Sequence, residues 1–411
     1  MITLPQELVD AICEYLRDDI SALSSSWLVS SSWMYASRRF LFRTIRVQDI
    51  SETAVPLITF YKFTSFMGAR PHLATLVREL HMTGKDDRQM RPHLLGSLLT
   101  SLTALEALYL YGCYVDGGSL SETSMLRSRF SLKVLHVDCC NSKDSDGFMD
   151  LIGILSMFSE IMSLSISTIG RSNITVSSGT ILPEQSYTRP RIIHLQCREM
   201  PTWMADCFME YILQSVPESP LLRLSFEASF RIPLSLFTVV RAAGAHLQYL
   251  DLHYTPSFNT AENERWAAGL SGISVCTALQ RFTIWTPLVI LPPLVPANWS
   301  ILLQILERLP RILRSLCFRF PKHWVIYPSL PPGIIGHDTV FQRWDNFLTQ
   351  FSWAQPVTFV FARFPWDSEH SQVEGLRLRD PNEFGPMLAS RLPNLHSKGM
   401  LEVSYEEGSE L

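Results

Sequence analysis

The sequence has few charged residues, no long uncharged apolar run and no spacing of cysteines or histidines that would hold a metal. Only 18% of its 411 residues are charged, whereas 46% are hydrophobic. A chain of this composition can bury a large core and is not expected to be disordered. No stretch reaches about 18 uncharged apolar residues, so we expect no membrane span and no membrane partner.

Cysteine use and net charge set further limits. No C-x-x-C pair or zinc-type Cys/His spacing occurs, and the N-terminal residues lack the basic stretch and continuous apolar run of a signal peptide. We therefore expect buried, reduced thiols in an intracellular protein of the cytoplasm or nucleus. The net charge, 35 − 39 = −4, gives no reason to expect a nucleic-acid partner. The cysteines are Cys13, Cys113, Cys139, Cys140, Cys197, Cys207, Cys276 and Cys317.

Catalytic motifs are also missing. The sequence has no G-x-S-x-G, Walker-type or H-E-x-x-H motif. Asp251, His253 and His246 lie close in sequence and could indicate acid–base chemistry. A strand would place Asp251 and His253 on an open face where neither is desolvated, so strongly shifted pKa values are not expected. We predict a protein that is not an enzyme and needs no cofactor or metal.

The first 47 residues have the spacing of short helices. Pro5 suits a first helical turn, and Leu8, Ile12 and Leu16 follow on one helical face. A second apolar group and a third helix around Trp33 come next. Helices this short bury little core, so the segment should rely on a partner or on the next domain.

One set of residues in this segment forms an ordered pattern. In sequence order they are Leu4-Pro5-Gln6-Glu7-Leu8, Ile12, Leu16, Leu28-Val29-Ser30, Trp33 and Leu41-Phe42. They resemble the F-box motif, whose members bind the Skp-type adaptor of cullin–RING ubiquitin ligases through apolar contacts. The alternative is an ordinary helical cap on the next domain. The resemblance implies these adaptor-facing residues: Leu4, Pro5, Leu8, Ile12, Leu28, Val29 and Trp33.

After residue 47 a short apolar phrase, L-x-x-L-x-L, recurs. Residues 105–110 and 132–137 fit it best, and looser copies are centred on Leu80, Leu164, Leu195, Leu224, Leu250, Phe282 and Leu316. Successive centres are 26 to 34 residues apart, which resembles leucine-rich repeats with one strand and one helix per unit. Residues 42–47 and 400–403 read as a first and a closing strand, and a tenth phrase is centred on Phe359.

The segments between the phrases have helical spacing, most clearly at 146–158, 203–216, 299–309 and 339–351. Parallel strands pack about 4.8 Å apart and helices about 10 Å apart, so stacked units should curve with strands inside and helices outside. The predicted class is α/β, with an F-box-like helical domain over 1–47 and a leucine-rich-repeat-type solenoid with a C-terminal cap over 48–411. A doubly wound α/β fold is the alternative; it would need fewer, longer strands.

Side chains alternate along a strand, so the residues that flank the inward leucines should share the concave face. Tyr, Trp and Arg are common interface anchors, and mixed charge favours a folded protein or peptide as the partner. Glu79, His81, Asp138 and Glu227 share this predicted face. The predicted target-binding residues are Tyr109, Tyr111, His136, Arg198, Arg223, Tyr249, Asp251, His253, Arg281, Trp285 and Arg319.

These patterns lead to a functional hypothesis. The resemblance implies a non-catalytic substrate-recognition subunit of an SCF-type ubiquitin ligase, which binds the adaptor with its helices and a target protein with its repeats. One alternative is a leucine-rich-repeat scaffold without ligase association, in which Ile12 and Trp33 are buried against the first repeat. An enzyme would require a deep pocket with converging titratable groups. The identity of the target is not predicted.

Overall fold

The computed structural model describes residues 4–49, 58–84, 89–90, 92–115, 130–138, 147–167, 189–216, 220–228, 233–253, 260–286, 302–320, 338–351, 355–363 and 384–407. The chain forms two compact units, Met1–Glu199 and Met200–Leu411, which are described separately.

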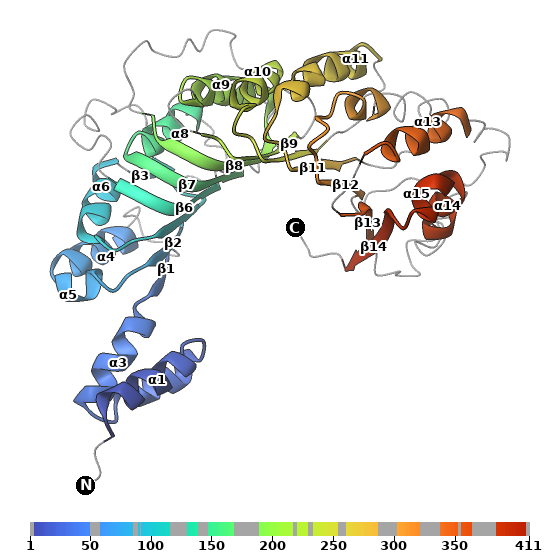
Figure 1. Ribbon diagram of the computed structural model, residues 1–411. Coiled ribbons are helices and arrows are strands. Elements are labelled where there is room, and N and C mark those ends of the chain that lie inside the picture. The colour runs from blue at the N-terminus through green and yellow to red at the C-terminus, as the bar shows by residue number, and fades with distance from the viewer. Residues whose placement is uncertain are drawn as a thin grey trace, which may run out of the picture. The chain divides into compact units, whose positions relative to one another are not determined.

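Unit 1 begins with three short helices, α1 (Gln6–Tyr15), α2 (Ile20–Trp27) and α3 (Ser31–Leu41) (Figure 1). Pro5 directly precedes α1, and its carbonyl accepts the first helical hydrogen bonds. The Asp19 carboxylate caps α2 by accepting from the N–H of Ala22 at 2.9 Å. The three predicted helices are therefore confirmed.

The rest of unit 1 alternates parallel strands with helices. The strands run in sequence order, each parallel to the one before: β1 (Thr44–Gln48), β2 (Glu79–Thr83), β4 (Ala107–Tyr111), β6 (Phe130–Asp138), β7 (Phe158–Ser167) and β8 (Arg191–Met200). The helices are α4 (Ile58–Gly68), α5 (Pro71–Ala74), α6 (Pro92–Ser101) and α8 (Gly147–Leu155). Two further short strands, β3 (Gln89–Met90) and β5 (Tyr114–Val115), pair with each other.

Unit 2 repeats the arrangement. Its strands, again parallel and in sequence order, are β9 (Arg223–Ala228), β10 (Tyr249–His253), β11 (Arg281–Trp285), β12 (Ser315–Phe320), β13 (Val357–Arg363) and β14 (Leu401–Glu407). Its helices are α9 (Thr202–Leu213), α10 (Leu234–Ala243), α11 (Thr260–Gly269), the 3₁₀ helix η4 (Leu270–Val275), α13 (Asp338–Leu348), α14 (Phe384–Arg391) and α15 (Pro393–Ser397).

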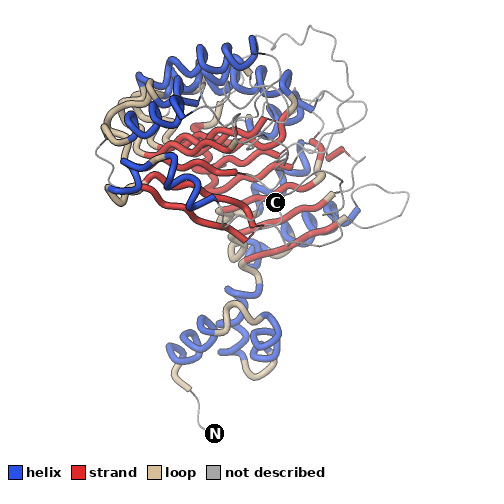
Figure 2. Tube along the Cα trace, turned by 90° about the vertical axis from the view of Figure 1, so that its right-hand side faces the viewer, coloured by secondary structure: helices blue, strands red, loops and turns tan. Residues whose placement is uncertain are grey.

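In each unit the connecting helices lie along one side of the strands (Figure 1). Figure 2 shows the strands lying next to one another in succession. A doubly wound sheet would instead reverse its strand order and carry helices on both faces. The described parts of both units keep a sequential order. The fold is thus α/β with parallel strands and helices around them.

The predicted centres of the repeat lie in one row of each unit. In unit 1 this row consists of Leu80, Leu108, Leu135, Leu164 and Leu195. In unit 2 it consists of Leu224, Leu250, Phe282 and Leu316. None is more than 1% exposed, and burying each contributes about 1.5–3 kcal/mol. The period of the sequence therefore predicted the register of the strands.

The tenth phrase is two residues out of register. Phe359 pairs with Phe318, so the residue that continues the Leu316 row is Val357. The prediction of Phe359 as the centre was wrong because Val357, Phe359 and Phe361 are all buried and alternate in the same way. Alternation alone does not show which of three apolar residues is the middle one.

The other predicted elements have close counterparts. Residues 42–47 and 400–403 correspond to β1 and β14. Three predicted helices correspond to α8, α9 and α13, and residues 302–306 are helical within the fourth. Residues 299–301 of that fourth helix lie outside the described residues. Among the helices that the structure describes, none has the length and apolarity to cross a bilayer.

Candidate functional site

Helix α1 is apolar on two sides, and only one of them is buried. Val9 and Cys13 are 1% and 0% exposed and pack with Leu23 and Ala36 in the core of the three helices. The other side carries a stripe of exposed apolar residues, Leu8, Ile12 and Tyr15, and Leu4 just before the helix is exposed as well. A contiguous exposed apolar stripe is typical of an interaction surface.

The turn after α2 also carries exposed apolar residues. Leu28 and Val29 are 83% and 66% exposed. Trp33 differs from the other six predicted adaptor-facing residues, because it is half-buried and packs against the core of the three helices. Helical spacing identifies an apolar face, but it does not show which face a neighbouring helix covers. The six exposed predicted residues are Leu4, Pro5, Leu8, Ile12, Leu28 and Val29.

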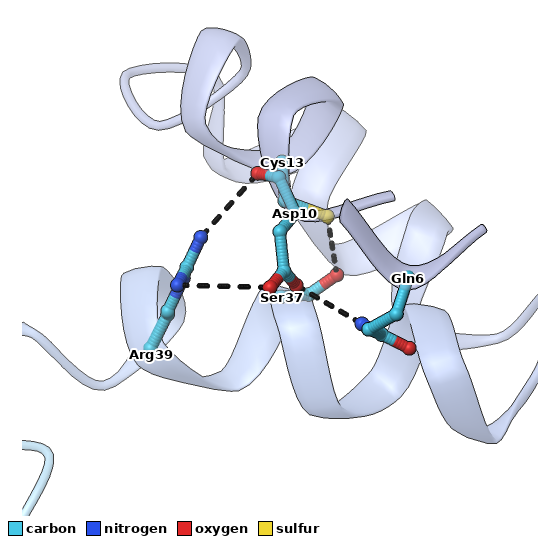
Figure 3. Close-up of polar contacts among 5 residues, drawn as sticks. All are labelled: Gln6, Asp10, Cys13, Ser37 and Arg39. Carbon is cyan, nitrogen blue, oxygen red and sulfur yellow. Dashed lines mark hydrogen bonds and ion pairs between the residues drawn. The ribbon is translucent and has the colours of Figure 1, made fainter. Parts of the chain in front are cut away.

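Polar contacts hold α1 against α3, as Figure 3 shows. The Asp10 carboxylate accepts from Nε2 of Gln6 at 3.0 Å and lies 4.0 Å from Nη1 of Arg39. Nη2 of Arg39 also donates to the Asp10 carbonyl at 3.4 Å. In the core, the Cys13 Sγ and Ser37 Oγ atoms are 3.6 Å apart. These contacts fix the orientation of α1 and hence of its exposed stripe.

The strand face of unit 1 carries a row of aromatic rings. The rings of His81 and Tyr109 stack 4.2 Å apart, with 4° between their planes. Tyr111 stacks at 6.4 Å from Tyr109, and His136 lies 5.2 Å from Tyr111. Because the rings cover one another, their edges, hydroxyls and ring nitrogens are the parts that a partner could contact.

Burial and neighbouring charges shift the pKa values of residues in this row. The His81 imidazole contacts the Glu79 carboxylate at 2.7 Å. Burial, together with the Arg198 and His81 charges, lowers the pKa of His136, which favours its neutral form. Burial and the Glu79 carboxylate raise the pKa of Tyr109, so its hydroxyl stays protonated. With the Gln196 amide oriented to accept, its oxygen lies 2.9 Å from two nitrogens of Arg198.

Unit 2 has a second stacked row, formed by residues in register on four strands. The Glu227 carboxylate lies 3.7 Å from the His253 imidazole. That imidazole stacks on the Trp285 indole at 4.6 Å, with 12° between the ring planes. The Arg319 guanidinium lies 4.8 Å from the same indole. Strands on both sides of β11 therefore cover the faces of Trp285.

One expectation about this face was wrong. Asp251 and His253 were expected to be solvated, but their side chains are only 13% and 19% exposed. The reason is lateral packing: Asp251 pairs with Arg223 at 3.1 Å, and His253 lies between Glu227 and Trp285. Within the described residues, no group of three or more His, Cys, Asp or Glu side chains could hold a metal.

The predicted target-binding residues fall into two sets. Tyr109, Tyr111, His136 and Arg198 lie on the strands of unit 1. The set in unit 2 is Arg223, Tyr249, Asp251, His253, Arg281, Trp285 and Arg319. The sequence analysis missed Ser165 of β7, which lies beside His136 of the aromatic row in unit 1. Its signal was a polar position between the buried residues Leu164 and Ile166, and a small hydroxyl at such a position does not stand out in composition.

Comparison with models of known protein families gives no match for this sequence, and comparison with curated proteins gives none either.

Proposed function

We propose that the protein is a non-catalytic substrate-recognition subunit of an SCF-type ubiquitin ligase. Its three N-terminal helices would bind the Skp-type adaptor, and its strand faces would hold a target protein. The strand-and-helix units would form a leucine-rich-repeat-type solenoid. The contribution of such a subunit is proximity and orientation of the target, not bond chemistry.

The exposed apolar stripe of α1 is the main support for this proposal. Leu8 and Ile12 are 52% and 38% exposed although both belong to a regular helix with a well-packed opposite side. Leu28 is more exposed still. These residues match the positions at which F-box segments contact their adaptor, and burying them in a partner would release apolar surface from water.

The alternative, a repeat scaffold without a ligase partner, predicts that Ile12 and Trp33 are buried against the first repeat. Ile12 is 38% exposed, and Trp33 packs within the three helices themselves. Both observations favour a surface prepared for another protein over a simple cap.

Co-purification with the Skp-type adaptor tests the proposal. Leu8→Asp and Leu28→Asp place a charge on the exposed surface without disturbing the core of the three helices. A carboxylate buried unpaired in the complex costs about 2 kcal/mol or more, so adaptor affinity should fall at least about 30-fold. Trp33→Ala is less informative, because loss of binding could follow from unfolding of the helices.

Leu234→Asp is the matched control, because Leu234 is 64% exposed and belongs to α10 of unit 2. It should leave adaptor binding unchanged. Equal adaptor binding by the wild-type chain and by Leu8→Asp would remove the assignment.

A further inference from the structure

The modest net charge of the chain conceals a strongly basic stretch. Residues 265–337 contain seven cationic residues and one acidic residue, Glu307, which gives 7 − 1 = +6. The rest of the chain therefore carries −4 − 6 = −10. Such asymmetry is typical of a surface that binds a charged partner. The cationic residues are Arg265, Arg281, Arg308, Arg311, Arg314, Arg319 and Lys322.

Three of these arginines lie together where β11 and β12 begin. Arg281 is the first residue of β11, and Arg311 and Arg314 lie in the turn before β12. The N–H of Arg314 donates to the carbonyl of Gln280 at 2.9 Å, which places Arg314 beside Arg281. All three arginines are exposed, and so is Ile312 between the last two, at 50%. We call Arg281, Arg311, Ile312 and Arg314 the basic patch.

The basic patch lacks acidic partners within the described structure. Glu307, the single acidic residue of the stretch, pairs instead with Arg343 of α13 at 3.0 Å. None of the three patch arginines forms an ion pair with a described residue. Their guanidinium groups are therefore available to an external anion.

Strand beginnings in unit 1 show the opposite arrangement. There Glu106 lies between Lys133, at 2.8 Å, and Arg78, at 3.5 Å. Arg191 lies 3.8 Å from Glu160 on the neighbouring strand. These cations at the strand beginnings of unit 1 are thus neutralised internally. In unit 2, Arg223 at the start of β9 likewise pairs with Asp251 at 3.1 Å, whereas Arg281 and Arg314, where β11 and β12 begin, have no carboxylate partner among the described residues.

We propose that the basic patch docks an acidic segment of a partner protein, with at least one apolar side chain of that segment against Ile312. Arginine pairs well with carboxylates because its planar group can donate two parallel hydrogen bonds. If the proposed function is correct, this segment belongs to the ligase target. The docking chemistry itself does not depend on the adaptor.

A protein segment fits the patch better than a nucleic acid. Single-stranded nucleic acids bind by stacking bases on exposed aromatic faces. Trp285, the large aromatic residue of β11, has His253 against one face and Arg319 against the other. An exposed isoleucine between two arginines suits an acidic peptide with an apolar residue instead.

A binding titration tests the proposal on the full chain. The probe is a fluorescein-labelled peptide of repeated Glu-Glu-Leu triplets, and its neutral counterpart has Gln-Gln-Leu triplets. The Glu probe should bind at low salt, weaken as salt rises, and bind at least about tenfold more tightly than the Gln probe. The double variant Arg281→Ala with Arg314→Ala should weaken Glu-probe binding about tenfold.

The matched control is Arg241→Ala with Arg265→Ala, which removes the same charge from exposed positions on α10 and α11. It should change the affinity less than about twofold. The proposal is overturned if the Glu probe does not bind, if the Gln probe binds equally, if the control weakens binding as much as the patch variant, or if oligouridylate binds more tightly than the Glu probe.

Adaptor co-purification with the same patch variant separates the two proposals. If the patch variant still binds the adaptor but no longer binds the Glu probe, the acidic segment does not bind at the N-terminal helices. A wild-type chain that binds the Glu probe but never the adaptor would end the ligase assignment and leave the docking surface intact.

Discussion

At the scale of single residues, Thr283 stands out because its hydroxyl is buried without a hydrogen-bond partner. The residue is 2% exposed, and its Oγ1 has no hydrogen-bond partner among the residues that the structure describes. It lies between Arg281 and Trp285 along the strand, on the face opposite the core residues Phe282 and Ile284. An unsatisfied buried hydroxyl costs about 1–3 kcal/mol.

Replacing this hydroxyl should therefore not harm the protein. Thr283→Val keeps the shape of the side chain and removes the unsatisfied group, so we expect the free energy of unfolding to stay the same or rise by about 1 kcal/mol. Urea denaturation followed by circular dichroism measures it. Thr358→Val is the control, because Thr358 donates to Glu402 on the neighbouring strand and should lose stability. A loss of about 1 kcal/mol in Thr283→Val would show that the hydroxyl has a partner after all.

Residue types at the candidate surfaces were largely predictable, whereas their surroundings were not. The sequence identified Leu8 and Ile12 as one helical face, and both are exposed. It also grouped Trp33 with them, although the third helix turns that ring toward the core. Likewise, the burial of His253 depends on Trp285 of the next strand, which no local pattern reveals.

At the scale of elements, carboxylates from one helix cap the beginning of another. Asp345 of α13 is 2% exposed and accepts from the N–H groups of Asn394 and Leu395, at 2.9 and 2.8 Å, in the first turn of α15. Asp206 of α9 accepts from Ser235 at the start of α10 in the same way. Such caps satisfy N–H groups that a helix leaves unpaired at its beginning.

Removing the Asp345 carboxylate should loosen the C-terminal part of unit 2. Asp345→Ala leaves the buried N–H of Leu395 and the partly buried N–H of Asn394 unpaired, which should cost about 2–3 kcal/mol. Hydrogen exchange should accelerate at the amides of Asn394 and Leu395 before it does so elsewhere. Asp10→Ala, which removes an exposed contact between α1 and α3, should change stability by less than about 1 kcal/mol. Unchanged exchange at both amides would contradict the capping role.

The strands were predictable because each is specified by its own alternation of apolar residues. The leucine period even placed Leu80 opposite Leu108 and Leu224 opposite Leu250. The register of β13 was missed because three buried residues alternate there without distinction. The caps were missed because their partners, such as Asp345 and Leu395, are 50 residues apart in sequence.

At the scale of the whole molecule, the N-terminal helices have a core of their own. Val9, Cys13, Leu23 and Ala36 form a separate buried cluster. The first backbone group that joins the strands is the carbonyl of Arg43, which accepts from Arg78 and Glu79. The boundary between these two contact sets lies near the predicted one at residue 47.

A chain that lacks residues 1–41 should therefore keep the folded strands. We expect its melting temperature to change by less than about 2–4 °C, which corresponds to about 1 kcal/mol. It should lose the Skp-type adaptor and still bind the Glu-Glu-Leu probe. Thermal melts and the same binding titration measure this, and insolubility or loss of a cooperative melt would show that the helices stabilise the strands.

The net charge of the whole chain did not reveal that one stretch of it is strongly basic. A net value of −4 gave no reason to look for a cationic surface, yet residues 265–337 alone carry +6. The sequence already contained this signal. Its meaning depends on the fold, which places Arg281 and Arg314 where the adjacent strands β11 and β12 begin, while Glu307 pairs with Arg343.

The sequential order of the parallel strands has a mechanical consequence. Within the main sheet of unit 1, which leaves out the short pair β3 and β5, each strand is bonded only to the sheet strands just before and after it in the chain. Under tension applied at its ends, such a unit should unfold stepwise at low force, one strand at a time from an edge of the sheet. It should refold in the same steps. A unit that unfolds in this way can extend when a bound partner is pulled, without unfolding completely in one cooperative step.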